Sequence, residues 1–146
     1  MIGYLDTSAF IPLLIAEPGS QAAGKFWNLA DAVVSSRVMY IESAAALAQA
    51  CRLGRITDDQ HAAGKHHLEA LWQQLDVVDL DDSFVRYAGE LAADHALRGY
   101  DAAHCAAAAL VNDSDVVAAS GDKRLLAAWK TIGVATFDVN DPDDAR

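Results

Sequence analysis

The chain has 146 residues, of which 53% are hydrophobic, and 21 acidic residues against 11 basic ones give a formal net charge of −10. This length is typical of one domain, and the apolar content suffices for one buried core. The acidity excludes nucleic-acid binding by general phosphate neutralisation, so a nucleic-acid enzyme of this composition needs bound cations or a local basic cluster.

No apolar run reaches the length of about 18 residues that a membrane span needs. The longest one, residues 1–15, is interrupted by Asp6 and Pro12 and lacks the basic start of a signal peptide. Cys51 and Cys105 lie in Ala-rich segments and are predicted to be buried free thiols. We therefore expect a cytoplasmic protein that does not enter the membrane.

Short apolar runs alternate with helical patterns along the chain. In chain order, the first half predicts a strand over 1–5, a helix opened by Asp6-Thr7-Ser8 that ends at Pro18, a helix over 21–30, a strand over 32–35 and a helix over 36–53. The second half predicts a helix over 57–75, a strand over 77–80, a helix over 81–97, a helix from Asp101 to Leu110 or Val111, a strand over 115–119, a short helix over 125–130 and a strand over 134–137.

This alternation predicts a three-layer α/β/α sandwich with a central, mainly parallel five-stranded sheet. Residues 1–139 form the expected domain, and residues 140–146 form an acidic tail that is expected to be frayed. In parallel sheets of this kind, ligands bind at the carboxyl ends of the strands, at the point where the strand order reverses. The residues that follow each strand are therefore the first to inspect.

Four acidic residues stand beside strongly apolar sequence at such places. Asp6 follows the first strand, Asp122 follows the fourth, Asp101 opens a helix and Glu42 lies one turn into another helix. Carboxylates gathered at the mouth of a core repel one another and need a cation or a proton. Mg²⁺ and Mn²⁺ take oxygen ligands, and a two-ion site holds both reacting oxygens of a phosphodiester.

Each acid also has a structural interpretation when it is taken alone. Asp6 can be a helix cap, Asp101 a partner of the helix dipole, Glu42 a solvated residue and Asp122 a turn residue. The coincidence of all four on one strand–helix rhythm favours a site.

Four segments give the sequence a specific resemblance: Tyr4 to Ala9, Tyr40 to Glu42, Leu97 to His104 and Ser120 to Leu125. On these segments the chain resembles the PIN-domain family, and within it the VapC-type toxins of bacterial toxin–antitoxin pairs. The third segment is the most diagnostic. The fourth departs modestly, since the family usually has Thr where Ser120 stands.

The resemblance implies a PIN-like fold and a divalent-metal-dependent ribonuclease. It places Asp6, Glu42, Asp101 and Asp122 as catalytic residues that bind Mg²⁺ or Mn²⁺, with Asp122 at the family's most variable acidic position. It also implies an RNA substrate, a homodimer, and an antitoxin partner whose tail blocks the site. Because an open cluster of carboxylates attracts a cation, we expect the antitoxin to insert a basic side chain, Arg, into the cluster.

Further residues near the predicted mouth have two interpretations each. Thr7, Ser8 and Ser120 carry hydroxyls that can orient Asp6 or a bound water, or can serve as ordinary caps. His104 lies one turn from Asp101 and either reaches the site or packs in the core. Four basic residues either hold RNA phosphates or are solvated surface charges: Arg37, Arg98, Lys123 and Arg124.

Two other functions compete with the ribonuclease. A metal-dependent phosphate hydrolase of the haloacid-dehalogenase type would use Asp6 as nucleophile, but it needs a second Asp where Ser8 stands. An inactive PIN-fold binding module would be expected to lack one or more of the acids, and all four are present. Divalent-dependent cleavage of RNA, measured with the wild type and with Asp6→Asn, separates the three.

Overall fold

The computed structural model of the chain describes residues 1–144. Within these residues the strands form one five-stranded sheet in the order β3-β2-β1-β4-β5, and all four neighbouring pairs are parallel. The strands are β1 (Ile2–Leu5), β2 (Ala32–Ser36), β3 (Leu75–Val78), β4 (Val116–Ser120) and β5 (Ala135–Asp138).

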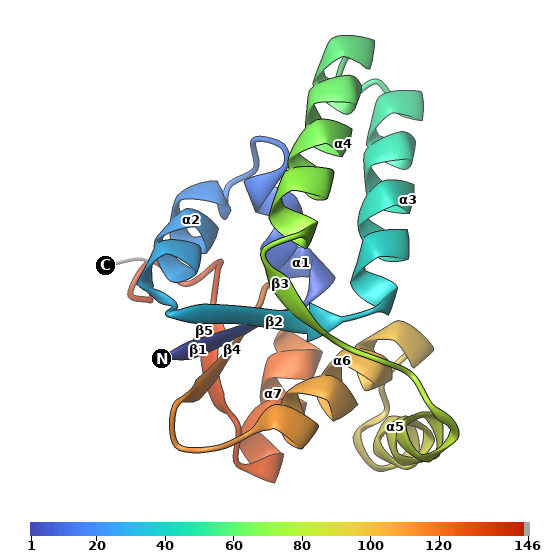
Figure 1. Cartoon of the computed structure of the whole chain (residues 1–146), viewed down its shortest axis with the longest axis vertical. Coiled ribbons are helices and arrows are strands. Elements are labelled where there is room, and N and C mark those ends of the chain that lie inside the picture. The colour runs from blue at the N-terminus through green and yellow to red at the C-terminus, as the bar shows by residue number, and fades with distance from the viewer. Residues whose placement is uncertain (145–146) are drawn as a thin grey trace.

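Helices cover both faces of this sheet (Figure 1). One face carries α1 (Thr7–Phe10), the 3₁₀ helix η1 (Ile11–Leu13), α2 (Ser20–Leu29), α3 (Val38–Arg52) and α4 (Asp58–Trp72). The other face carries α5 (Asp82–His95), α6 (Gly99–Val111) and α7 (Lys123–Ile132). Each face buries its own hydrophobic cluster, so the predicted three-layer α/β/α sandwich is confirmed.

The strand order reverses between β1 and β4. The chain moves from β1 outward through β2 to β3, then returns to β4 on the opposite side of β1. Leu5 and Ala119 are register partners near the carboxyl ends of these two strands. The residues that follow β1 and β4 therefore share the switch point, where ligands of parallel sheets bind.

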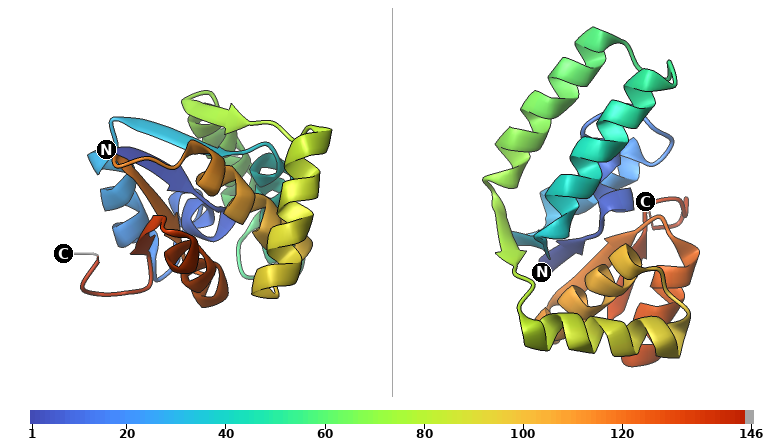
Figure 2. Two further views of the ribbon diagram at one scale, coloured as in Figure 1. Left: turned by 90° about the horizontal axis from the view of Figure 1, so that it is seen from below. Right: turned by 90° about the vertical axis from the view of Figure 1, so that its right-hand side faces the viewer.

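Local sequence explains where several elements begin and how closely they pack. Thr57 and Gln60 form the predicted capping box, in which each side chain bonds the backbone N–H of the other residue. A Cβ at position 3 would lie 2.8 Å from the ring of Phe26. Because Gly3 has no Cβ, α2 can approach β1 closely. Helices α3 and α4 pair as a hairpin that extends beyond the sheet (Figure 2).

Several predicted elements were wrong in their bounds by two or more residues, for example the helix over 57–75, which ends at Trp72, and three others have a clear physical reason. The first helix stops at Phe10 and continues as η1, since Pro12 lacks the N–H that an α-helix needs. The third strand comes two residues earlier than predicted, because Leu75 is the buried partner of Val33 while Leu80 is exposed. Helix α6 begins two residues earlier, so Asp101 lies within its first turn.

Two smaller expectations also need a correction or a limit. Cys105 is buried as predicted, but Cys51 is only half-buried and donates to Asp58. In the tail, the side chain of Asn140 donates to the backbone of Gly121, whereas residues 145–146 of that tail lie outside the described residues. None of the helices between residues 1 and 144 is long and apolar enough to cross a membrane.

Candidate active site

Asp6 lies at the end of β1, with a side chain that is 3% exposed. Its carboxylate caps α1 by accepting from the backbone N–H of Ala9 at 2.9 Å. The hydroxyl of Ser8 donates to both carboxylate oxygens at 2.8 and 2.9 Å, and Ser120 donates to Oδ2 at 2.7 Å. Asp6 is thus a helix cap and an oriented acid at once.

Burial raises the pKa of the Asp6 carboxyl above its ordinary value, although the nearby imidazole of His104, the hydroxyls of Ser120 and Ser8 and the N–H of Ala9 oppose that shift. The charged form is therefore costly in this structure despite its hydrogen bonds. A cation placed beside Asp6 would favour the carboxylate, so the environment is suited to an acid that binds one.

Glu42 lies one turn into α3 and faces the start of α1. The hydroxyl of Thr7 donates to its Oε1 at 2.8 Å, and Nε2 of His104 lies 2.7 Å from the same oxygen. His104 is 1% exposed, so it is both a packed core histidine and a partner of a candidate acid. Ser8 contacts Asp6, whereas Thr7 contacts Glu42.

Asp101 and Asp122 are joined through Arg98. The guanidinium Nε of Arg98 lies 3.2 Å from Asp101, and its Nη2 lies 3.7 Å from Asp122. Asp122 also caps α7 through Oδ1, which accepts from the backbone of Arg124 and Leu125 at 2.9 and 3.1 Å. Of the two oxygens of Asp122, Oδ1 therefore has a structural role and Oδ2 faces Arg98.

The turn between β4 and α7 ties the two acid pairs together. The hydroxyl of Ser120, which donates to Asp6, accepts from the N–H of Asp122 at 2.9 Å. The N–H of Gly121 donates to Ser8 at 2.8 Å, and a Cβ on Gly121 would lie 2.9 Å from the amide nitrogen of Asn140. A glycine here lets the turn close against the tail, so Asp122 is held near Asp6.

Three of the four predicted basic residues gather beside these acids. Arg98, Lys123 and Arg124 line a hollow of about 660 Å³ together with Asp101, Gly121 and Asp122. Arg37 does not line it, because its guanidinium pairs with Asp79 at 2.7 Å at the end of β3. Three basic and two acidic side chains therefore share this hollow.

The chain is similar to known proteins over most of its length. The sequence profile of the PIN domain family matches residues 3–129. The chain belongs to the PIN-domain family. Ribonuclease VapC45 of Mycobacterium tuberculosis (strain CDC 1551 / Oshkosh) is 43% identical over 122 residues, which cover 84% of this PIN domain protein and 85% of that relative.

Solved structures share the fold of this PIN domain. VapC20 of Mycobacterium tuberculosis, described as a Sarcin-Ricin loop cleaving toxin, has a TM-score of 0.67 and 18% identity over 86% of this chain and 94% of that one. VapBC-5 of the same organism, a member of a family of toxin–antitoxin systems, has a TM-score of 0.59 and 22% identity over 94% of this chain and 98% of that one.

The four acids of this PIN domain share only some of their partners: Arg98 contacts Asp101 and Asp122, and Ser120 links Asp6 to the backbone of Asp122. Among residues 1–144, no three acidic, imidazole or thiol side chains are arranged to hold a metal ion. The donor set nevertheless fits Mg²⁺ or Mn²⁺ in kind, since it consists of carboxylate and hydroxyl oxygens. The guanidinium of Arg98, between Asp101 and Asp122, is a cation already in contact with that set.

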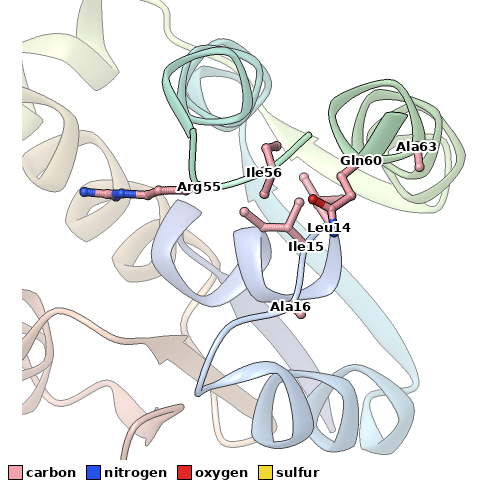
Figure 3. Close-up of a pocket in the computed structure, with 7 residues that line it drawn as sticks. All are labelled: Leu14, Ile15, Ala16, Arg55, Ile56, Gln60 and Ala63. Atoms are coloured by element: carbon pink, nitrogen blue, oxygen red, sulfur yellow. The ribbon is translucent and has the colours of Figure 1, made fainter. Parts of the chain in front are cut away.

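A separate hollow of the PIN domain lies away from the acids. It has a volume of about 350 Å³ and lies between η1 and the start of α4 (Figure 3). Its lining is mostly apolar and includes Leu14, Ile15 and Ile56, with Arg55 pointing away from them. None of the four acids lines it, so this hollow is separate from the candidate active site.

Sequence reasoning missed Tyr4 as a part of the site. Its hydroxyl lies 2.8 Å from Nδ1 of His104, at the far end of the contact that His104 makes with Glu42. A tyrosine in a strand that is buried on both faces needs a partner for its hydroxyl, and this requirement was the available signal.

Proposed function

We propose that this PIN domain is the toxin component of a type II toxin–antitoxin system and acts as a divalent-metal-dependent endoribonuclease. The observation that carries the proposal is the buried Asp6 carboxylate at the switch point. Two further observations support it: Ser120 links Asp6 to the backbone of Asp122, and three basic side chains line a hollow with Asp101 and Asp122. The 43% identity to a protein named as a ribonuclease supports the same reaction.

In this proposal the oxygens of Asp6 and Asp101 hold Mg²⁺ or Mn²⁺, and Glu42 and Asp122 complete the site. When bound, the ion supplies Lewis-acid chemistry to an attacking water and to the phosphodiester. Asp101 has to release Arg98 to take part, and this costs little because an ion pair with an 80% exposed guanidinium contributes less than about 1 kcal/mol.

The residues of the chain itself bind and orient. Ser8 and Ser120 hold the Asp6 carboxylate in one orientation, so fewer degrees of freedom are lost when it binds a cation. Arg98, released from Asp101, joins Lys123 and Arg124 as a phosphate contact in the hollow. The RNA backbone would thus lie over the acids and be held by charge-assisted hydrogen bonds.

The geometry weighs against a phosphatase that uses Asp6 as nucleophile. Both oxygens of Asp6 accept hydrogen bonds from Ser8, and Oδ2 also accepts one from Ser120. A hydrolase of that type also needs a second Asp where Ser8 stands. Hydrolysis by an activated water is the better fit.

The proposal includes an antitoxin partner, a homodimeric toxin and action in the cytoplasm. Arg98 already pairs with two of the acids, which supports insertion of a second arginine by the partner at the same place. The partner's affinity is expected to fall when Asp6, Glu42 or Asp101 is neutralised singly, and titration of the three variants with the partner measures it. Unchanged affinity in all three would remove the site-blocking mechanism.

The test of the activity is cleavage of a structured RNA by the purified chain with Mg²⁺ or Mn²⁺ and with EDTA. We expect cleavage only with the metal, and we expect Asp101→Asn to abolish it while the circular dichroism spectrum stays unchanged. The matched control is Asp76→Asn, which neutralises an exposed acid on the edge strand β3 and should leave cleavage intact. Metal-independent cleavage, or cleavage by Asp101→Asn at the rate of the control, would contradict the proposal.

A further inference from the structure

A buried hydrogen-bonded chain runs from the core of the sheet to the candidate acid Glu42. The Tyr4 hydroxyl of β1 lies 2.8 Å from Nδ1 of His104 on α6, and Nε2 of His104 lies 2.7 Å from Oε1 of Glu42 on α3. Tyr4 is fully buried and His104 is 1% exposed. The chain therefore connects three elements that lie far apart in the sequence.

The direction of each hydrogen bond follows from the chemistry of the partners. An ionised carboxylate only accepts, so Nε2 of His104 donates to Glu42. In the neutral imidazole, Nδ1 is then the acceptor, and the Tyr4 hydroxyl donates to it. Burial, reinforced by the charge of Asp6, raises the pKa of Tyr4 well above its ordinary value, so this hydroxyl keeps its proton.

The surroundings of His104 make a purely packing role costly. The residues of α6 from Ala102 to Ala108 are all buried, and apart from His104 they are alanines and one cysteine. Tyr4 packs edge-on against both Trp129 and the imidazole, with ring centroids at 5.8 and 6.0 Å. A polar ring in such a helix needs partners for both nitrogens. Here Tyr4 contacts Nδ1, and Glu42 at 2.7 Å and the Thr7 hydroxyl at 3.2 Å contact Nε2.

The hydrogen bonds to Glu42 all fall on one of its oxygens. Both Thr7 and His104 contact Oε1, at 2.8 and 2.7 Å, and within the described part of the chain Oε2 has no such contact. The Glu42 side chain is 20% exposed, so the carboxylate stands between the buried chain and the mouth of the site. Fixing Oε1 leaves Oε2 to meet a cation or a phosphate-bound water.

We propose that Tyr4 and His104 are positioning residues, which set the orientation of the Glu42 carboxylate for divalent-metal binding from inside the core. The inference rests on the proposed function, because it assigns Glu42 to the metal site. Partners of this kind behind a ligand change metal affinity or activity by about 10–100-fold when they are removed.

Two substitutions of His104 separate positioning from packing. In His104→Gln, the side-chain amide nitrogen takes the place of Nε2 and still donates to Glu42. In His104→Asn, the amide is shorter, so it keeps a partner for Tyr4 but no longer reaches Glu42. We expect calorimetric titration with Mn²⁺ to show an affinity about 10–100-fold lower for His104→Asn and a much smaller loss for His104→Gln.

Tyr4→Phe is the second variant, since it removes only the hydroxyl at the far end of the chain. Like His104→Asn, it should weaken Mn²⁺ binding. In addition, long-range ¹H–¹⁵N spectra of the wild type should show the His104 tautomer with the proton on Nε2. Thermal melts identify variants that remain folded, and the Mn²⁺ comparison is made on those. If one His104 variant fails to fold, the Mn²⁺ affinity of Tyr4→Phe and the tautomer of His104 in the wild type test the positioning role.

The failure of the inference and the failure of the proposed function look different. Equal Mn²⁺ affinities of wild type, His104→Asn and Tyr4→Phe, in a chain that still cleaves RNA with Mn²⁺, would overturn the positioning role and leave the function standing. A wild type that neither binds Mn²⁺ nor cleaves RNA would overturn both. A proton on Nδ1 in the wild type would also overturn the inference.

Discussion

The two halves of the candidate site differ in how their acids are held. Asp6 and Glu42 are held by hydroxyls and an imidazole: Ser120 and His104 are buried, Thr7 is half-buried and Ser8 is exposed. Asp101 and Asp122 are instead bridged by Arg98, which is 80% exposed.

This difference predicts that the two halves differ in rigidity. A carboxylate fixed by buried hydroxyls keeps one orientation, whereas an exposed ion pair exchanges its partners at little cost. We therefore regard the Asp6–Glu42 half as preformed and the Asp101–Asp122 half as the part that opens. Substitutions in each half should separate the two.

Asp6→Asn should abolish metal-dependent RNA cleavage, lowering it by more than about 100-fold, because it removes a proposed ligand and not merely a group behind one. In EDTA at neutral pH the same variant should melt at a higher temperature than the wild type. The reason is that burial raises the pKa of Asp6, so the folded chain carries an unfavourable charge there.

The sign of the pH dependence follows from the raised pKa of Asp6. Its protonated form favours folding below the pKa of the unfolded chain, about 3.9, and this contribution is lost as the pH rises through the higher pKa of the folded chain. The stability advantage of Asp6→Asn should therefore grow with pH and disappear in acid. Urea unfolding in EDTA at several pH values measures it, and a lower stability of the variant at pH 7 would show that Asp6 is mainly structural.

Ser120→Ala should lower both stability and cleavage. Ser120 is fully buried and is the donor to Asp6 and the acceptor for Asp122, so its loss leaves buried groups unpaired at a cost of about 1–3 kcal/mol. Ser8→Ala is the matched control, since Ser8 is exposed and water can replace its hydroxyl. Urea unfolding measures the free energy of unfolding of both variants. If the two variants lose the same stability, the buried hydroxyl of Ser120 contributes no more than the exposed one of Ser8, and the Asp6–Glu42 half is not preformed.

Arg98→Ala should separate metal binding from RNA binding. Removing the guanidinium frees Asp101 and lowers the local positive charge, so Mn²⁺ affinity should rise by about 2–5-fold, which corresponds to an exposed ion pair. The KM for RNA should rise, because a phosphate contact is lost. Calorimetry and steady-state kinetics at one salt concentration measure the two effects. Weaker Mn²⁺ binding in this variant would contradict the opening of this half.

Arg37→Ala should have the smallest effect of the four substitutions. Arg37 pairs with Asp79 outside the hollow, and both side chains are exposed. We expect a melting temperature within error of the wild type and a change in the KM for RNA that is smaller than the change for Arg98→Ala. A larger change in the KM for RNA than that of Arg98→Ala would mean that RNA also contacts the surface at the end of β3.

The sequence predicted the parts of the fold that depend on local patterns. The alternation of short apolar runs and helices predicted a parallel sheet, and Thr57 and Gln60 predicted the start of α4, because a capping box is a local hydrogen-bond pattern. The start of β3 was missed, since the pairing of Leu75 with Val33 depends on a contact 42 residues away. Pro12 offered the signal for the early end of α1.

The candidate site shows the same limit. The positions of Asp6 and Asp122 after β1 and β4 could be predicted, because the ends of parallel strands share one edge. The placement of Arg98 between two acids and the line from Tyr4 through His104 to Glu42 depend on how α3 and α6 dock on the sheet, which no sequence spacing encodes.

The most direct test of the account is anomalous diffraction from crystals of the chain soaked in Mn²⁺. The account predicts an anomalous peak in contact with carboxylate oxygens of Asp6 and Asp101, with Arg98 displaced from Asp101 and Glu42 still bonded to His104. A peak remote from these residues would contradict it. The same holds for crystals without a peak at a Mn²⁺ concentration that supports RNA cleavage.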